Sequence, residues 1–433
     1  MQKQKILIIL PWLPFPLKTG GHQAIFNGID VIKDIYNIYI TFETVSDDNY
    51  SEAEQHFRDI MPTINICPLL HPVPEPIHIP KIAFRNRVKN KIKSLLHIKD
   101  KKNAPTHTIP FTNNQETTIA NTWKYMFLPP SKEWTEHIHN LCKKYHFDII
   151  QVEMPRMLSN IFILPKDAIK IFIHHELGFV RRELEFNNGI NSPFAESCKD
   201  FADQNEIRQL NMYDAVITLS DIDSNKLKEK GVYKPIYTSF ATINTNEDKY
   251  YRHNTTPQKR LTFIGSGSHE PNIYGLTWFL DKCWSILKEI DSEYTLDVIG
   301  RWSEQQIQSY VDTYKDINFL GFVEILSDVI HGSIMIVPIT VGSGIRMKIL
   351  EAAYNRVAFV STNIGAEGLP LRNGTECFIA NEPEKFVNSI LKLQDPILYN
   401  QMAKNAKDVI EKHYSIKTLK ENRLSIYRNL NKL

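Results

Sequence analysis

The chain has 433 residues, and its 51 basic and 49 acidic side chains leave a formal net charge of +2. Hydrophobic residues make up 42% and charged residues 23%, a balance that is typical of a soluble globular protein and excludes a disordered or collagen-like chain. A net charge this close to zero also argues against a dedicated nucleic-acid-binding protein, so no nucleic-acid partner is expected.

The length predicts two or three domains, with a core large enough to need no disulfide bonds. The cysteines are odd in number, and no pair has the spacing of metal ligands. We therefore expect reduced thiols in a cytoplasmic protein. The sequence contains no run of about 18 apolar residues, so no transmembrane helix is expected. The first apolar run is too short, and too soon followed by prolines, to resemble a secretion signal.

The first half of the chain alternates apolar runs with helical patterns. Residues 5–10 predict a strand, which a proline-rich loop ending in Gly20-Gly21 connects to a helix at residues 22–33. Continuous apolar runs predict further strands at residues 38–42, 148–152, 169–173 and 215–219. Strands of this kind, alternating with helices, indicate a parallel sheet covered on both faces.

Residues 70–130 interrupt this rhythm and are expected to form an insertion in the first domain. Within them, residues 81–102 carry nine Lys or Arg residues and one acidic residue, with apolar residues at helical spacing between the charges. A basic amphipathic helix of this kind is either an anchor on an anionic membrane surface or a solvated helix packed on its own domain. The sequence leaves both interpretations open.

A second α/β unit begins near residue 259. Its first strand, at residues 261–264, ends in Gly265-Ser266-Gly267 and leads to a helix at residues 272–290. The pattern then predicts strands at 294–299, 317–320, 334–338 and 358–361, and helices at 325–331, 345–354, 399–413 and 416–430. The polar residues 242–258 form the expected linker. The predicted fold class is therefore α/β, with two doubly wound, Rossmann-like halves.

The most informative stretch is residues 337–352, where a buried strand ends in a glycine-containing loop and leads into a helix. The N–H groups and the dipole at a helix N-terminus attract phosphate. Gly344 lets the backbone approach a ligand, while Arg346 and Lys348 add positive charge. Glu351 follows about one and a half turns later, where a carboxylate can bind ribose hydroxyls. Together these features predict a cradle for a nucleotide diphosphate.

This stretch, with residues 263–266 before it and 360–369 after it, resembles the C-terminal domain of GT-B glycosyltransferases. It is most similar to the retaining family-four enzymes (glycosyl transferases group 1). Residues 10–22 and 213–220 resemble the N-terminal half of the same family.

The resemblance implies two Rossmann-like domains that face a cleft. Residues 1–245 are the expected acceptor domain, and residues 246–412 are the expected nucleotide-sugar donor domain. Residues 413–433 are expected to form a C-terminal helix that packs back on the first domain.

The resemblance also implies roles in the donor site. Glu351 matches the family's ribose-binding glutamate and is expected to take part in catalysis. Where the family commonly has another glutamate, this chain has Ser343, and the Gly344 and Ile345 amides are expected to compensate.

A second departure concerns the phosphate-binding residues. The family's Arg and Lys after the first strand of the donor domain are absent here. Gly265 and Ser266 follow that strand instead and are expected to line the donor site, with Arg346 and Lys348 supplying the missing charge.

In the N-terminal half, the resemblance suggests that the backbone of Gly20 and Gly21 approaches the donor phosphate or the acceptor. His175 lies at the predicted carboxyl end of a strand and is expected to act near the donor sugar as a catalytic residue. Glu153 and Arg181 are expected on the acceptor side, although surface ion pairs would explain them equally well. Adjacent histidines on a strand point to opposite faces, so no metal site is expected.

The predicted function is transfer of a sugar from a nucleotide-diphosphate sugar to a glycan or lipid-linked acceptor, for a surface polysaccharide or glycoconjugate. Family frequency alone favours UDP as the nucleotide. Retention of configuration, no bound metal and no cofactor are implied by the resemblance. The expected location is cytoplasmic, with peripheral attachment to the inner face of the membrane as an option.

Other readings stay open. A sugar-nucleotide epimerase would need further acid and base groups in the cleft, and a phosphorylase often has a lysine that binds a cofactor. The sequence shows neither pattern. An inactive GT-B scaffold that binds partners is compatible with Ser343, although Glu351, Arg346 and Lys348 argue against it. An NAD-dependent dehydrogenase is disfavoured because the first glycine loop lacks the G-x-G-x-x-G pattern.

Overall fold

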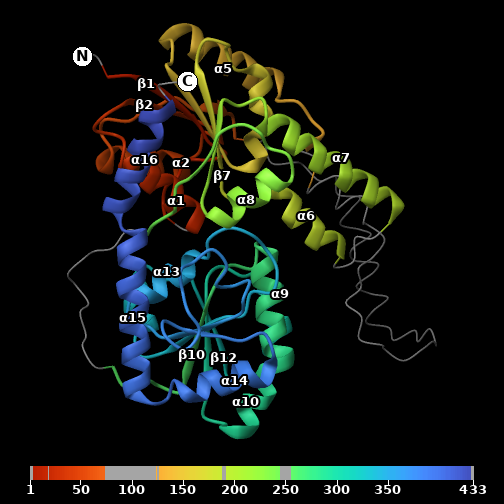
Figure 1. Ribbon diagram of the computed structural model, residues 1–433, viewed down its shortest axis with the longest axis vertical. Coiled ribbons are helices and arrows are strands. Elements are labelled where there is room, and N and C mark those ends of the chain that lie inside the picture. Colours follow the sequence, from red (N-terminus) through yellow and green to blue (C-terminus); the bar gives the residue numbers. More distant parts are fainter. Residues whose placement is uncertain are drawn as a thin grey trace, which may run out of the picture.

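The computed structural model describes residues 3–17, 19–73, 123, 126–187, 192–243 and 255–430. The predicted basic segment at residues 81–102 lies outside them. Figure 1 shows two α/β bodies stacked along the long axis of the molecule. Two C-terminal helices run along one side of both bodies.

The N-terminal body contains, within the described ranges, a seven-stranded parallel sheet with strand order β4-β2-β1-β6-β7-β8-β9. Its strands are β1 (Lys5–Ile9), β2 (Asn37–Thr41), β4 (Asn65–Ile66), β6 (Ile149–Glu153), β7 (Ile169–His174), β8 (Ala215–Thr218) and β9 (Ile236–Thr238). A separate parallel pair joins β3 (Glu43–Val45) to β5 (Leu69–His71). The sequence prediction of parallel, fully covered strands is confirmed.

Helices cover both faces of this sheet. Ile6 and Ile8 of β1 pack in one apolar cluster, and Leu7 and Ile9 pack in another on the opposite face. The helical segments are α1 (Gly20–Asp30), α2 (Asp48–Ile60), α5 (Lys132–Tyr145), the 3₁₀ helix η2 (Pro155–Ile163), α6 (Gly178–Asn187), α7 (Pro193–Leu210) and α8 (Asp221–Glu229). Because side chains alternate along a strand, a continuous apolar run supplies both clusters.

Short polar side chains fix where these helices begin. In five of these helices the cap residue accepts a hydrogen bond from a backbone N–H of the first turn, which satisfies one of the groups that a helix end leaves unpaired. These caps are Thr19 for α1, Asp47 for α2, Ser131 for α5, Ser192 for α7 and Ser220 for α8.

The C-terminal body contains, within the described ranges, a six-stranded parallel sheet with strand order β12-β11-β10-β13-β14-β15. Its strands are β10 (Arg260–Ile264), β11 (Thr295–Ile299), β12 (Ile317–Gly321), β13 (Ile334–Val337), β14 (Phe359–Ser361) and β15 (Phe378–Ile379). The helix predicted at 272–290 consists of α9 (Glu270–Phe279), a π-helical turn (Leu280–Trp284) and α10 (Ser285–Ile290). The remaining helices before the C-terminal pair are α11 (Glu304–Val311), α12 (Leu326–Ile330), α13 (Met347–Tyr354) and α14 (Pro383–Lys392).

The helix after β13 begins later than the sequence predicted. We expected it from residue 345, but α13 starts at Met347, with Arg346 as its N-cap in an extended conformation. Gly342 and Gly344 have φ angles of 120° and 80°, so the preceding loop cannot be helical.

The chain ends in two long helices, α15 (Pro396–Tyr414) and α16 (Ile416–Leu430). The first packs in the C-terminal core, where Tyr399, Met402 and Ile410 are buried. At Ser415 the backbone is extended, and α16 then buries Leu419 and Tyr427 in the N-terminal core. The predicted return of the last helix to the first body is confirmed (Figure 1). The domain boundaries at residues 245 and 412 stay predictions.

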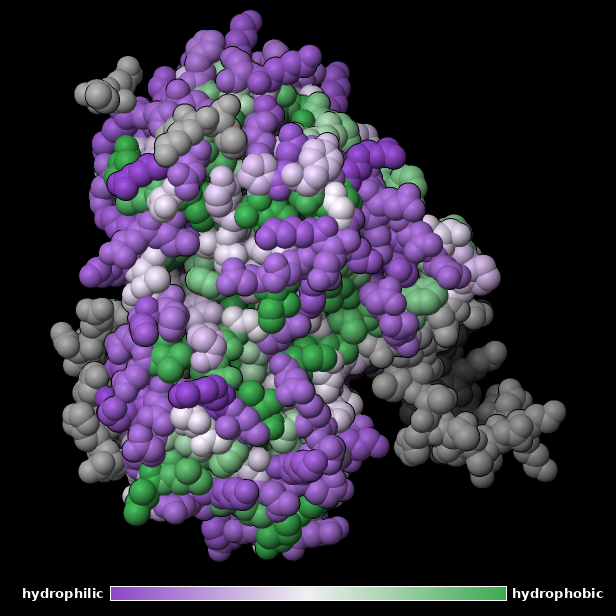
Figure 2. Space-filling model, in the orientation of Figure 1, coloured by the Kyte–Doolittle hydropathy of each residue, from purple (hydrophilic) through white to green (hydrophobic). Residues whose placement is uncertain are grey.

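Hydrophilic side chains cover most of the face seen in Figure 2, with apolar residues scattered among them. No helix within the described part of the chain is both long enough and apolar enough to cross a membrane.

The central strands should dominate the stability of the N-terminal body. Phe172 of β7 is fully buried and packs its ring against Tyr213 at 5.3 Å between centroids. We expect Phe172→Ala to lower the free energy of unfolding by about 3–5 kcal/mol, measured by chemical denaturation. Phe194→Ala on α7 is the control: its side chain is 54% exposed, so the change should stay within about 0.5 kcal/mol. Similar losses in both variants would contradict this.

Candidate active site

The candidate site lies where the carboxyl ends of the two sheets face each other. The loop between β13 and α13 meets the loop after β7, where the backbone N–H of Leu177 donates to Ser343 Oγ at 3.0 Å. The start of α1 meets α13: a Cβ placed on Gly20 would lie 2.6 Å from Met347 Cγ. Ligands of open α/β sheets bind at this edge.

Gly344 allows a close approach between the two bodies. A Cβ at this position would lie 2.8 Å from the carbonyl oxygen of His175, and its φ of 80° is itself unfavourable for a side chain. The glycine therefore brings the donor-side loop directly against the backbone that carries His175.

Arg346 has a guanidinium that is only partly used. Its Nη1 donates to the carbonyl oxygens of Gly344, at 2.6 Å, and of Ser343. Within the described part of the chain, its Nε and Nη2 are buried without a hydrogen-bond partner. Burial lowers the pKa of Arg346, and Glu176 partly opposes this, but a guanidinium remains charged at neutral pH. Buried donors of this kind need an acceptor, so the site fits an anionic ligand.

Lys348 lies beside the end of β10. Its Nζ donates to Asn272 Oδ1 at 2.8 Å and lies 4.6 Å from the centroid of the Phe263 ring. Burial, and secondarily Arg346, lowers its pKa to about 7. Asn272 in turn donates to the carbonyl oxygen of Ser266 at 3.1 Å. The lysine thus brings a cation to the loop where the resembled family places its own basic pair.

Glu351 contacts the opposite body through a residue that the sequence analysis did not single out. Gln23 Nε2 donates to Glu351 Oε1 at 3.1 Å. Burial raises the pKa of the Glu351 carboxyl, and this hydrogen bond lowers it. The position of Gln23, three residues after Gly20 on the first turn of α1, was the available signal.

The two adjacent histidines have separate environments. His174 is buried, and its Nε2 lies 2.8 Å from Glu206 Oε1 in a network that also contains Arg182. His175 lies on the cleft side, and its Nε2 is 2.7 Å from Oε2 of Glu153, which is 2% exposed. Among the described residues, no group of three or more His, Cys, Asp or Glu side chains is arranged to hold a metal ion.

Arg181 lies at another contact between the bodies. Its Nε is 2.8 Å from Glu185 Oε1, and its Nη2 is 3.6 Å from Oε2 of Glu270 at the start of α9. Lys226 of α8 similarly pairs with Glu367 at 3.0 Å. Arg181 is therefore engaged in one ion pair within α6 and in another with the C-terminal body, and its predicted contact with an acceptor stays a prediction.

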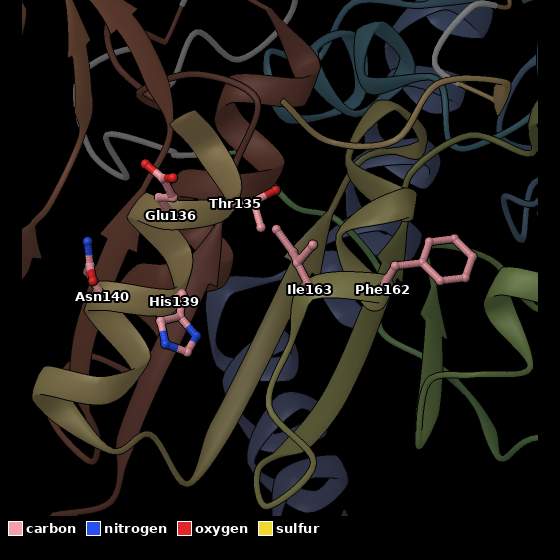
Figure 3. A pocket seen from close by; sticks show the side chains of 6 residues that line it. All are labelled: Thr135, Glu136, His139, Asn140, Phe162 and Ile163. Atoms are coloured by element: carbon pink, nitrogen blue, oxygen red, sulfur yellow. The ribbon is translucent and has the colours of Figure 1, made fainter. Parts of the chain in front are cut away.

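The structure brings most of the sequence-predicted residues to one place. Beside the groups above, Gly21 faces Met154, and the Gly265 backbone packs against Asn272. The loop that contains Ile345 joins Gly344 to Arg346. A different hollow, of ≈ 460 Å³, lies between α5 and η2 (Figure 3). It is lined at the end of η2 by Phe162 and Ile163, from where the chain returns to the amino end of β7, away from His175.

Comparison with known proteins shows what the two bodies are similar to. Residues 258–395 match the family "Glycosyl transferases group 1". The C-terminal body of this chain is therefore similar to glycosyltransferases of this family. The matched region contains the glycine loop, Arg346, Lys348 and Glu351, so the similarity covers the half of the site that carries the positive charge.

Solved structures share the fold across the whole chain. TarM is 13% identical with a TM-score of 0.64, and 99% of each chain is covered. HepE from Anabaena, solved with UDP-glucose, is 14% identical with a TM-score of 0.62, covering 98% of this chain and 99% of that one. Sucrose-phosphate synthase from Thermosynechococcus elongatus is 13% identical with a TM-score of 0.63, covering 99% and 100%. These similarities show the GT-B fold.

A sequence relative comes from Klebsiella pneumoniae and is described as an uncharacterized 44.6 kDa protein in the cps region. It is 26% identical over 215 residues, which are 47% of this chain and 54% of the relative. The match thus spans about half the length of that protein.

The Lys348 ammonium should give stability a distinctive pH dependence. Its pKa is about 7 in the folded chain and about 10.4 when unfolded. Between these values the unfolded state binds the extra proton, so the stability contributed by this group rises with pH. We expect the stability of Lys348→Met, relative to wild type, to be highest near about pH 6 and to fall toward about pH 10.

Chemical unfolding across that pH range measures the difference. Lys392→Met is the matched control, because Lys392 also lies near an aromatic ring, 5.8 Å from the Phe378 centroid, but is exposed. A stability difference for Lys348→Met that does not change with pH would contradict the lowered pKa.

Proposed function

We propose that this protein is a glycosyltransferase that moves a sugar from a UDP-sugar to a glycan or lipid-linked acceptor, with retention of configuration and without a bound metal. The observation that carries the proposal is the Arg346 guanidinium, whose Nε and Nη2 are buried beside a glycine loop and have no hydrogen-bond partner among the described residues. A diphosphate would supply the missing acceptors. Charged hydrogen bonds of this type are among the strongest that proteins make.

Each donor-side residue has a place in this proposal. Arg346 and Lys348 bind the diphosphate and stabilise the charge that develops on it as the glycosidic bond breaks. Glu351 accepts hydrogen bonds from the ribose hydroxyls, and Gln23 holds its second oxygen. Gly20 and Gly21 form the opposite wall, where a side chain would meet Met347 or Met154.

Retention would follow from attack on the face of the sugar that the diphosphate leaves. The departing phosphate oxygen can then accept the proton of the acceptor hydroxyl, so no separate protein base is needed. In this scheme the protein mainly positions the two substrates and stabilises charge. His175 contacts the donor sugar through its ring, as a hydrogen-bonding group rather than a base.

The identity of the nucleotide and the biosynthetic pathway are inferred from relatives. Structures of S. aureus TarM and Anabaena HepE contain UDP or UDP-glucose, which supports UDP as the nucleotide. The Klebsiella relative lies in a cps region, which supports a role in surface polysaccharide synthesis. An acceptor attached to a lipid would place the enzyme at the inner face of the membrane.

Nucleotide binding tests the donor site directly. We expect UDP, rather than GDP, ADP or CMP, to raise the thermal midpoint of the wild-type chain, equally with and without magnesium. A ligand at 100 times its Kd adds about 2.7 kcal/mol of stability. Glu351→Ala should abolish most of the shift, whereas Glu411→Ala, an exposed glutamate of α15, should retain it.

The contribution of the two positive charges to UDP binding is tested with separate variants. Arg346→Ala and Lys348→Met should each weaken UDP affinity roughly 10-fold or more, since each removes a charged hydrogen bond to phosphate. Isothermal titration measures this, with Lys392→Met as the control. Unchanged UDP affinity in both site variants would refute the phosphate role, and no shift with any nucleotide near millimolar concentration would favour an inactive scaffold.

A further inference from the structure

A series of hydrogen bonds between buried polar side chains connects His175 to the C-terminal helix. Glu153 Oε2 lies 2.7 Å from His175 Nε2, and Glu153 Oε1 accepts from Gln151 Nε2 at 2.5 Å. The hydroxyl of Tyr427, on α16, donates to Gln151 Oε1. Gln151 and Glu153 are two residues apart on β6, so their side chains leave the strand on the same face.

The chemistry of the groups fixes the direction of every hydrogen bond between His175, Glu153, Gln151 and Tyr427. A carboxylate accepts only, so Nε2 of His175 must carry a proton toward Glu153. Gln151 donates through its amide nitrogen to the other carboxylate oxygen, which leaves its amide oxygen to accept from Tyr427. A flipped Gln151 amide would set its oxygen against the carboxylate and its nitrogen against the hydroxyl.

The three side chains of Glu153, Gln151 and Tyr427, which we call the relay, are all buried. Tyr427 is 0%, Gln151 1% and Glu153 2% exposed. Burying such groups is costly unless each is satisfied, and a fully satisfied network holds its members in one arrangement. The ring of Tyr427 is also fixed by an edge-on contact with Tyr36, at 5.5 Å between centroids. His174 draws on a different carboxylate, Glu206, so the relay serves His175 alone.

We propose that Glu153, Gln151 and Tyr427 are positioning residues for His175. They hold its imidazole with the proton on Nε2, so that Nδ1 presents a lone pair as a hydrogen-bond acceptor. Among the described residues, none hydrogen-bonds Nδ1. A sugar hydroxyl of the substrate is the group that this lone pair would accept from.

The proposal gives the C-terminal helix a chemical role. Apolar contacts of Leu419, Ile426 and Leu430 explain why α16 packs on the first body, but they do not require a tyrosine hydroxyl at residue 427. The hydroxyl supplies the far end of the relay. The tautomer of His175 does not depend on the identity of the donor, so only the sugar contact rests on the proposed function.

Nitrogen-15 NMR of the full-length protein, labelled at histidine and free of ligand, tests the relay. The His175 signal is assigned from its loss in His175→Asn. Wild type should show the tautomer protonated on Nε2. Gln151→Met keeps the side-chain volume but removes both relay hydrogen bonds, and it should shift His175 toward a mixture of tautomers. Tyr427→Phe should give a smaller shift in the same direction, and Glu153→Gln a larger one.

Tyr213→Phe is the matched control. Its hydroxyl is equally buried in the N-terminal body and donates to the Leu158 carbonyl oxygen at 2.9 Å, outside the relay. It should leave the His175 signal unchanged at a similar loss of stability. A wild-type ring protonated on Nδ1, or Gln151→Met and Tyr427→Phe spectra that match that of Tyr213→Phe, would overturn the proposal. Failure of UDP to bind would leave this result unaffected and would count against the proposed function only.

Discussion

The close approach of Gly344 to the His175 backbone is the constraint on which the site depends. With no Cβ at this position, the glycine loop can lie against the loop after β7, and Ser343 can accept the Leu177 N–H. This contact sets the distance between the charged half of the site and the histidine half. A side chain at residue 344 would push the bodies apart, which would also strain the Gln23–Glu351 hydrogen bond.

Ser343 has a structural explanation that the sequence could not provide. A glutamate is common at the equivalent position of the resembled family, and its absence left a gap in the expected donor site. In this fold the shorter hydroxyl accepts a backbone N–H of the opposite body and is itself 7% exposed. A residue that might have indicated lost activity instead joins the two halves of the cleft.

Much of the fold could be predicted because its signals are local. Continuous apolar runs identified strands such as β1 and β13, and the glycine loop with its basic residues marked the donor half. The start of α13 was placed two residues early, since the positive φ of Gly344 is not visible in a pattern of apolar residues. Gln23 pairs with a residue 328 positions away, and the relay behind His175 joins residues up to 276 positions apart; pairings of that kind arise only from packing.

The half-buried ammonium of Lys348 links nucleotide binding to the proton concentration. With a pKa of about 7, this group is only partly charged near neutrality when the site is empty. A bound diphosphate would favour the charged form, so each binding event would take up a fraction of a proton and each release would return it. Nucleotide affinity would then weaken as the pH rises above about 7, and the departure of the spent nucleotide would become easier in a more alkaline cell.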